Sequence, residues 1–266
     1  MTKKMLRNDK SVFFFDIDGT LISFKTHRMP ASTQRALNML REKGVKLFVA
    51  TGRAPKDTDF LKEYFDFDGI VSFNGQYCFD KNGVIYQSTF ALKSVSAILP
   101  YLAEHNIACC FETVSGNRFN LIDSRVTELL ELVGMSHVTP VLADMDNLPA
   151  EIFQLTVYVT PEEEKPLMKL LPECKALRWS PLLINVIRKD SGKPVGIAKV
   201  AERYGIKRDE IMVFGDGGND IDMLKYAGIG VAMGNAVAEA KSAADYVTSD
   251  VDEDGIFKAL EHFGLI

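Results

Sequence analysis

The sequence has only four cysteines, and their spacing is not that of a metal cage or a disulfide scaffold. Cys78, Cys109, Cys110 and Cys174 form no CxxC pair, and two adjacent cysteines suit neither kind of framework. We therefore expect reduced cysteines that mostly fill buried space.

Long apolar runs and an excess of positive charge are also missing. The run Val12–Phe15 is cut by Asp16 and Asp18, so it is far too short for a signal-peptide core or a membrane span. We expect the chain to stay in the cytoplasm, away from membranes. The formal net charge of -5 provides no basic field to hold nucleic acid. A small ligand fits this charge better, and nothing in the sequence indicates an oligomeric state.

Internal repeats, low-complexity segments and the GxxxxGK[ST] phosphate loop are absent as well, and the last absence excludes a P-loop NTPase. The 266 residues, 47% hydrophobic and 25% charged, have an ordinary globular composition. They suffice for one large α/β domain or for a core with a smaller inserted module.

Both ends of the sequence alternate short apolar strands with helical patterns. Strands separated by helices of this length favour parallel pairing in a Rossmann-like α/β core. The predicted strands are 11–15, 45–50, 70–73, 211–214 and 229–232, and the predicted helices are 32–43, which stops at Gly44, 197–204 and 220–226.

The middle of the chain has a different pattern, with helices and strands less regularly alternated. It predicts a compact α/β module inserted into a core made of residues 1–87 and 190–266, with the insertion spanning 88–189. The predicted helices there are 94–105, 124–133 and 161–171, and the predicted strands are 107–114, 118–122, 152–160 and 182–188.

Asp16 and Asp18 follow the first predicted strand in the motif DIDGT. Residues two apart on an extended chain share a face, so both carboxylates project from the carboxyl end of a strand, where open α/β sheets bind ligands. Asp16 is then a nucleophile toward phosphorus and Asp18 a general acid and base, with Thr20 orienting Asp18. Alone, an Asp pair beside Gly19 is equally well a simple turn.

Three further segments add chemistry at predicted strand or helix ends. Thr51 and Gly52 can donate to phosphate oxygens, whereas Arg53 is either a substrate contact or, more commonly for this residue type, a solvated side chain. Lys193 precedes a helix and can neutralise a transferring phosphoryl group, although most lysines are exposed.

The segment GDGGND at 215–220 follows a predicted strand and offers two carboxylates and an amide. Oxygen ligands of this kind suit Mg²⁺, with Asp216 as direct ligand, Asp220 supporting the water shell of the metal and Asn219 helping to hold phosphate. The alternative is a solvated turn that caps the next helix.

The chain resembles the haloacid dehalogenase superfamily, and within it the Cof-type sugar phosphatases, through four segments: DIDGT at Asp16, TGR at Thr51, the lysine Lys193 and GDGGND at Gly215. The resemblance covers nearly the whole chain and implies an α/β cap at the insertion. It implies that Asp16, Asp18 and Asp216 hold Mg²⁺, Asp18 through its backbone carbonyl, and that Thr51 and Lys193 bind phosphate.

The resemblance also identifies Asn74 and Gly75 as similar to the NG motif between core and cap of that group. Gln76 replaces its usual alanine, Gly217 and Gly218 replace a small polar and a variable residue, and Asn185 stands where an acidic residue is expected.

The predicted activity is Mg²⁺-dependent hydrolysis of a small phosphorylated metabolite, most of all a sugar phosphate, through an aspartyl-phosphate. Glu112 and Arg118 are candidate specificity residues of the cap. A phosphosugar mutase of the same superfamily remains an alternative, as does a non-catalytic Mg²⁺-binding module similar to a receiver domain.

Overall fold

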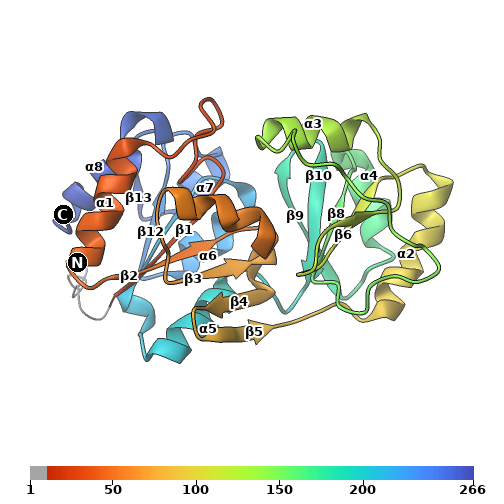
Figure 1. Ribbon diagram of the computed structural model, residues 1–266, viewed down its shortest axis with the longest axis horizontal. Coiled ribbons are helices and arrows are strands. Elements are labelled where there is room, and N and C mark those ends of the chain that lie inside the picture. The colour runs from red at the N-terminus through yellow and green to blue at the C-terminus, as the bar shows by residue number, and fades with distance from the viewer. Residues whose placement is uncertain (1–10) are drawn as a thin grey trace.

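The structure, a computed structural model, describes residues 11–266 and contains two separate β-sheets (Figure 1). The larger sheet has eight strands in the order β13-β12-β11-β1-β2-β3-β4-β5, and the smaller has five in the order β7-β6-β8-β10-β9. The predicted fold class, a mostly parallel α/β core with an inserted smaller α/β unit, is confirmed.

The eight-stranded sheet draws its strands from both ends of the described chain. Neighbouring strands from β13 to β3 run parallel, whereas β3, β4 and β5 pair antiparallel. The strands are β1 (Val12–Phe15), β2 (Lys46–Ala50), β3 (Gly69–Ser72), β4 (Tyr77–Asp80), β5 (Gly83–Gln87), β11 (Ile211–Gly215), β12 (Ile229–Ala232) and β13 (Tyr246–Val247).

Helices cover both faces of this sheet because its central strands are apolar on both sides. In β1, Phe13 and Phe15 pack with α1 and α8, while Val12 and Phe14 pack with α5, α6 and α7. The helices are α1 (Ala31–Glu42), α5 (Lys193–Tyr204), α6 (Ile221–Tyr226), α7 (Ala238–Ala243) and α8 (Gly255–His262), with short 3₁₀ helices η2 (Pro55–Glu63), η3 (Phe73–Gly75), η4 (Arg208–Glu210), η5 (Gly218–Asp220) and η6 (Val251–Glu253).

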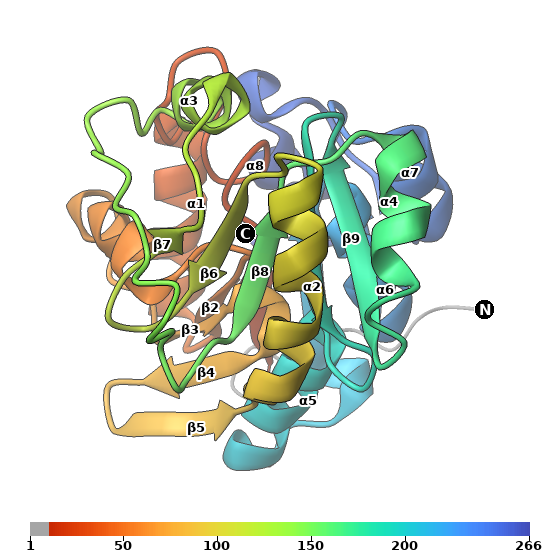
Figure 2. The ribbon, with the colours of Figure 1, turned by 90° about the vertical axis from the view of Figure 1, so that its right-hand side faces the viewer.

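The five-stranded sheet is antiparallel and carries α2 and α4 on the face that points away from the larger sheet (Figure 2). Phe111, Leu155 and Ile184 pack under these helices, so the residues that alternate with them point toward the larger sheet. The elements are β6 (Cys109–Glu112), β7 (Arg118–Phe119), β8 (Gln154–Val157), β9 (Cys174–Ser180), β10 (Leu183–Arg188), α2 (Leu92–Glu104), α3 (Ser124–Leu132) and α4 (Pro161–Met168).

Every helix and strand predicted above corresponds to an element of the structure, shifted or shortened by a few residues. The hairpin β4–β5, strand β9 and the C-terminal elements α7, β13 and α8 are not predicted. Strand β9 lies at the edge of its sheet and five of its seven residues are half-buried, so its sequence shows no clean alternation. All four cysteines are free and buried, as predicted.

The predicted boundaries near residues 88 and 189 fall after β5 and after β10, between the two sheets. The exact division into core and insertion stays a prediction. Residues 1–10 of the predicted core lie outside the described part of the chain. Within residues 11–266, no helix has both the length and the apolar character needed to cross a membrane.

Substitution of Gly75 can test how tightly the segment after β3 packs against the start of α5. Its φ is 95°, and a Cβ there would lie 2.1 Å from the carbonyl oxygen of Gly192. We expect Gly75→Ala to lower the free energy of unfolding by more than about 2 kcal/mol, measured by urea denaturation, because backbone strain and overlap both act. Gly44 is the control, since its φ is 79° with open space around it. Gly44→Ala should cost about 1 kcal/mol, and equal losses at both positions would contradict the packing argument.

Candidate active site

Four neighbouring strands, β11, β1, β2 and β3, end at one edge of the eight-stranded sheet, and the predicted motifs follow them. Asp16 follows β1, Thr51 follows β2, Asn74 lies in η3 after β3, and Asp216 follows β11. The carboxyl ends of parallel strands are where open α/β sheets bind ligands. The structure therefore brings segments from distant parts of the chain to one place.

Lys193, the first residue of α5, lies between two carboxylates at this edge. Its Nζ is 2.5 Å from Oδ1 of Asp16 and 2.6 Å from Oδ1 of Asp220, and its side chain is fully buried. The alternative of a solvated lysine is wrong. Oδ2 of Asp220 accepts the backbone N–H groups of Asp216 and Gly217, each at 2.9 Å. Both oxygens of Asp220 are thus engaged, and Asp220 positions the lysine and the loop.

Asp16, Asp216 and Asp220 form a cluster in which one oxygen of each lies within 4.8 Å of the others. Burial, followed by the charge of Asp220, raises the pKa of Asp16 to about 7. Burial and the charge of Asp16 raise the pKa of Asp216 well above its usual range, although Thr20 Oγ1 donates to Asp216 Oδ1 at 2.7 Å. Thr20 therefore supports Asp216 and not Asp18, the partner that the sequence analysis expects.

The cluster concentrates more negative charge than Lys193 offsets, so it fits a divalent cation. Carboxylate oxygens are the donors that hard cations such as Mg²⁺ prefer. The carboxylate of Asp18 lies outside this cluster. Its predicted share in a metal site, through the backbone carbonyl, stays a prediction.

Arg53 forms a two-point ion pair with Asp18. Nη2 lies 2.6 Å from Oδ1 and Nε lies 2.8 Å from Oδ2, with side-chain exposures of 12% and 19% for the arginine and the aspartate. Nη2 also donates to the carbonyl of Val133 at 3.2 Å, and Nη1 lies 3.4 Å from the sulfur of Met135. The solvated-arginine interpretation is wrong, because Arg53 joins Asp18 to the segment after α3.

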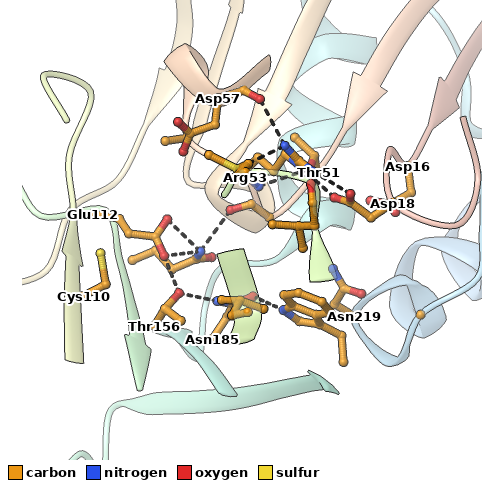
Figure 3. A pocket seen from close by; sticks show the side chains of 18 of the residues that line it. Asp16, Asp18, Thr51, Arg53, Asp57, Cys110, Glu112, Thr156, Asn185 and Asn219 are labelled. Carbon is orange, nitrogen blue, oxygen red and sulfur yellow. Dashed lines mark hydrogen bonds and ion pairs between the residues drawn. The ribbon is translucent and has the colours of Figure 1, made fainter. Parts of the chain in front are cut away.

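A cavity of about 310 Å³ lies between the two sheets. Asp16, Asp18 and Asn219 line it on the side of the larger sheet, and Glu112 and Asn185 line it on the side of the smaller one (Figure 3). Thr51 and Gly52 line it too. A reacting phosphate in this cavity would lie between the charged edge and the smaller sheet.

The wall from the smaller sheet is a connected polar network. Gln154 Nε2 donates to both oxygens of Glu112 at 3.1 Å, and the hydroxyl of Thr156 donates to Glu112 as well. Asn185 Nδ2 donates to Thr156 Oγ1 at 2.7 Å. Burial raises the pKa of Glu112 to about 7, against the lowering effect of its hydrogen bonds.

Asn74 links this network to the larger sheet. Its Nδ2 donates to Gln154 Oε1 at 2.7 Å, and its Oδ1 accepts from Asn219 Nδ2 at 3.1 Å. Gln154 Nε2 also donates to the carbonyl of Gly52 at 3.0 Å. Asn74 is fully buried, so its contacts join the two sheets. Its predicted contact with substrate, like that of Gly75, stays a prediction.

Gly218, the second glycine after Asp216, has a steric explanation. A Cβ on Gly218 would lie 2.5 Å from the carbonyl oxygen of Arg178 in β9. The adjacent Trp179 lines the cavity and donates its indole N–H to Asn185 Oδ1 at 2.9 Å. A larger residue at position 218 would push β9 and Trp179 away from the site.

Sequence reasoning missed several residues of the cavity wall. Gln154, Thr156 and Tyr158 alternate with Leu155 and Val157, which pack under α2 and α4. That alternation was a readable signal of a strand with one polar face. Trp179 was missed because strand β9 was missed, and Glu112 was named only as a candidate specificity residue.

Comparison with known proteins agrees with this geometry. The family model described as haloacid dehalogenase-like hydrolase matches residues 13–260. This chain belongs to the haloacid dehalogenase superfamily. It is of the Cof type, subclass IIB, and we call its five-stranded unit the cap from here on.

Individual relatives cover almost the whole chain. A Bacillus subtilis protein named "Putative phosphatase YkrA" is 35% identical over 97% of this chain and 99% of its own. The solved structure of the subclass IIB sugar phosphatase BT4131 is 40% identical, covers 96% of this chain and 100% of that one, and has a TM-score of 0.89. BT1666 from Bacteroides thetaiotaomicron, a phosphatase of the superfamily, is 37% identical, covers 97% of both chains and has a TM-score of 0.87.

The chain is therefore a phosphatase of this superfamily, a phosphoric monoester hydrolase that acts on small phosphorylated metabolites. This assignment favours an enzyme over the receiver-like alternative. The site agrees, because a deep cavity meets the carboxylate cluster at the strand ends.

The buried carboxyl of Glu112 predicts a pH dependence of stability. Its pKa is raised from 4.5 to about 7 in the folded protein, so the folded state binds the extra proton between these values. Stability is therefore lost as the pH rises from about 4.5 to about 7, by about 3 kcal/mol in total, and the loss is complete above 7. We expect Glu112→Gln to lose less stability than the wild type between pH 5 and pH 9 in thermal melts. Glu128→Gln, exposed on α3, is the control. Parallel pH profiles for wild type and Glu112→Gln would refute the assignment.

Proposed function

We propose that the chain is a Mg²⁺-dependent phosphatase that hydrolyses a sugar phosphate through an aspartyl-phosphate on Asp16. The position of Asp16 carries this proposal. Its carboxylate stands at the carboxyl end of β1, lines the cavity and is held at 2.5 Å by the buried ammonium of Lys193. A carboxylate so held can attack phosphorus in line, since the lysine offsets charge on the phosphoryl oxygens.

In the first step, an oxygen of Asp16 forms a bond to phosphorus while the bond from phosphorus to the alcohol oxygen breaks. For this step Asp18 must leave its ion pair with Arg53 and carry a proton, which it gives to the departing oxygen. Thr51, Gly52 and Asn219 line the cavity, and we expect them to hold the other phosphoryl oxygens. In the second step, Asp18 takes a proton from water, and the water oxygen bonds to phosphorus while the bond from phosphorus to the Asp16 oxygen breaks. This restores the carboxylate of Asp16 and releases inorganic phosphate.

Mg²⁺ would be held by Asp16, Asp216 and the backbone carbonyl of Asp18, with Asp220 in support. Bound there, it would supply positive charge that offsets repulsion between Asp16 and the incoming phosphate. The carboxylate cluster and the raised pKa values of Asp16 and Asp216 support this donor set.

Two observations support a sugar phosphate as the substrate. The sugar phosphatase BT4131 is 40% identical over almost the whole chain. The cap wall also presents polar side chains, Glu112, Gln154 and Thr156, that can bind hydroxyl groups. Hydrolysis separates this proposal from the phosphosugar mutase, because only a phosphatase releases free phosphate at each turnover.

Replacement of the nucleophile tests the mechanism. Asp16→Asn should reduce phosphate release from a hexose phosphate to background, because an amide cannot form the acylphosphate. Asp59→Asn, whose side chain is 64% exposed in η2, should retain wild-type activity. Phosphate release by Asp16→Asn at more than about 1% of the wild-type rate would end the proposed mechanism.

Metal removal tests the second half of the proposal. EDTA should abolish phosphate release and added Mg²⁺ should restore it. Mg²⁺ should also raise the melting temperature of the wild type, because it relieves repulsion within the carboxylate cluster. In Asp216→Asn that rise should be smaller. An equal rise in both proteins would show that Mg²⁺ binds elsewhere.

A further inference from the structure

The cavity is acidic at both ends. Among the described residues that line it, Arg53 is the one basic side chain, and its guanidinium is paired with Asp18. At the cap end, Glu112 lines the wall without a Lys, Arg or His beside it among the described lining residues, whereas Asp57, from η2, lies near Arg53. A second anion on the substrate would therefore meet carboxylates.

Glu112 is bound by neutral donors alone. Its oxygens accept from Gln154 and Thr156, and its remaining acceptor capacity faces the cavity that it lines. An ionised carboxylate has about four acceptor sites, so a ligand hydroxyl can fill one that the protein leaves open. Charge-assisted hydrogen bonds of this kind are stronger than neutral ones. Glu112 is thus suited to accept a hydrogen bond from a hydroxyl group of the leaving group.

Part of the cap wall of the cavity is apolar. Leu129, Val133 and Met135 line it from α3 and the segment that follows, and Trp179 lines it from β9. A sugar combines a hydroxyl edge with C–H faces, so it can meet Glu112 on one side and these side chains on the other. A small acyl or ionic leaving group would leave Glu112 unsatisfied.

We propose that Glu112, held in place by Gln154 and Thr156, forms the subsite for the leaving group, and that it selects an uncharged polyhydroxyl group over one bearing a second phosphate or a carboxylate (Figure 3). The proposal rests on the phosphatase function of Asp16. It bears on the mutase alternative, because a mutase that passes a phosphoryl group between sugar hydroxyls through a sugar bisphosphate must accommodate the second phosphate.

The test compares wild type and Glu112→Gln on three substrates: the hexose 6-phosphate with the highest kcat/KM, its 1,6-bisphosphate, and 4-nitrophenyl phosphate. Wild type should prefer the monophosphate to the bisphosphate by more than about 100-fold, because like charges repel in a site shielded from water. Glu112→Gln should lower kcat/KM for the hexose 6-phosphate about 10-fold to 100-fold, mainly through KM. The ratio of kcat/KM for the monophosphate to that for the bisphosphate should be smaller in Glu112→Gln than in the wild type.

4-Nitrophenyl phosphate has no hydroxyl for Glu112, so its kcat/KM should stay within about twofold in Glu112→Gln, which also shows that the variant is folded. The exposed Glu128→Gln should match wild type on all three substrates. Equal losses on hexose 6-phosphate and 4-nitrophenyl phosphate would overturn the subsite alone, as would wild-type activity on the bisphosphate equal to that on the monophosphate. No phosphate release from any substrate by wild type would overturn the phosphatase function and the subsite together.

Discussion

The buried ammonium of Lys193 is the interaction on which the site depends. It meets Asp16 at 2.5 Å and Asp220 at 2.6 Å, and so ties β1, the start of α5 and the loop after β11 to one point. A buried charge without its partner costs about 3–5 kcal/mol, so these three elements are held together by the same contacts that position Asp16, the proposed nucleophile. The position of Asp16 is therefore a result of the fold and not of a flexible loop.

How much the sequence could predict follows from how local each signal is. Asp16, Thr51 and Asp216 each follow an apolar run directly, so their place at a strand end is readable from their own segments. The burial of Lys193 and Arg53 is not readable in this way. The carboxylates that neutralise Lys193 lie 177 and 27 residues away, and the one that neutralises Arg53 lies 35 residues away. For such residues composition favours a solvated side chain, and only the tertiary partner reverses that expectation. The hydrogen bond from Thr20 to Asp216, in place of the predicted one to Asp18, also depends on a residue distant in the sequence and could not be predicted from the local motif.

The cap was predictable in outline and not in detail. Its helices and inner strands follow apolar patterns, so the two-unit α/β organisation could be predicted. The residues that face the cavity lie on strands in which polar and apolar side chains alternate, and the apolar ones dominate the sequence pattern. The pattern therefore predicts a strand at Gln154 and Thr156 but does not show that their side chains line a cavity. Trp179 reaches the site only because Gly218 lets β9 approach. Neither the sequence around Gly218 nor that of β9 contains a local pattern that predicts this contact.

Charge explains why the two ends of one cavity have different chemistry. With Asp18 neutralised by Arg53, the ionised cluster of Asp16, Asp216 and Asp220 around Lys193 has an excess of two negative charges, which one divalent cation would balance. The strand-end site can then receive a phosphate dianion. Glu112 has no such compensation, since its donors are the neutral Gln154 and Thr156. Further hydrogen-bond donors would stabilise its charge, and in the proposed subsite a polyhydroxyl leaving group would supply them.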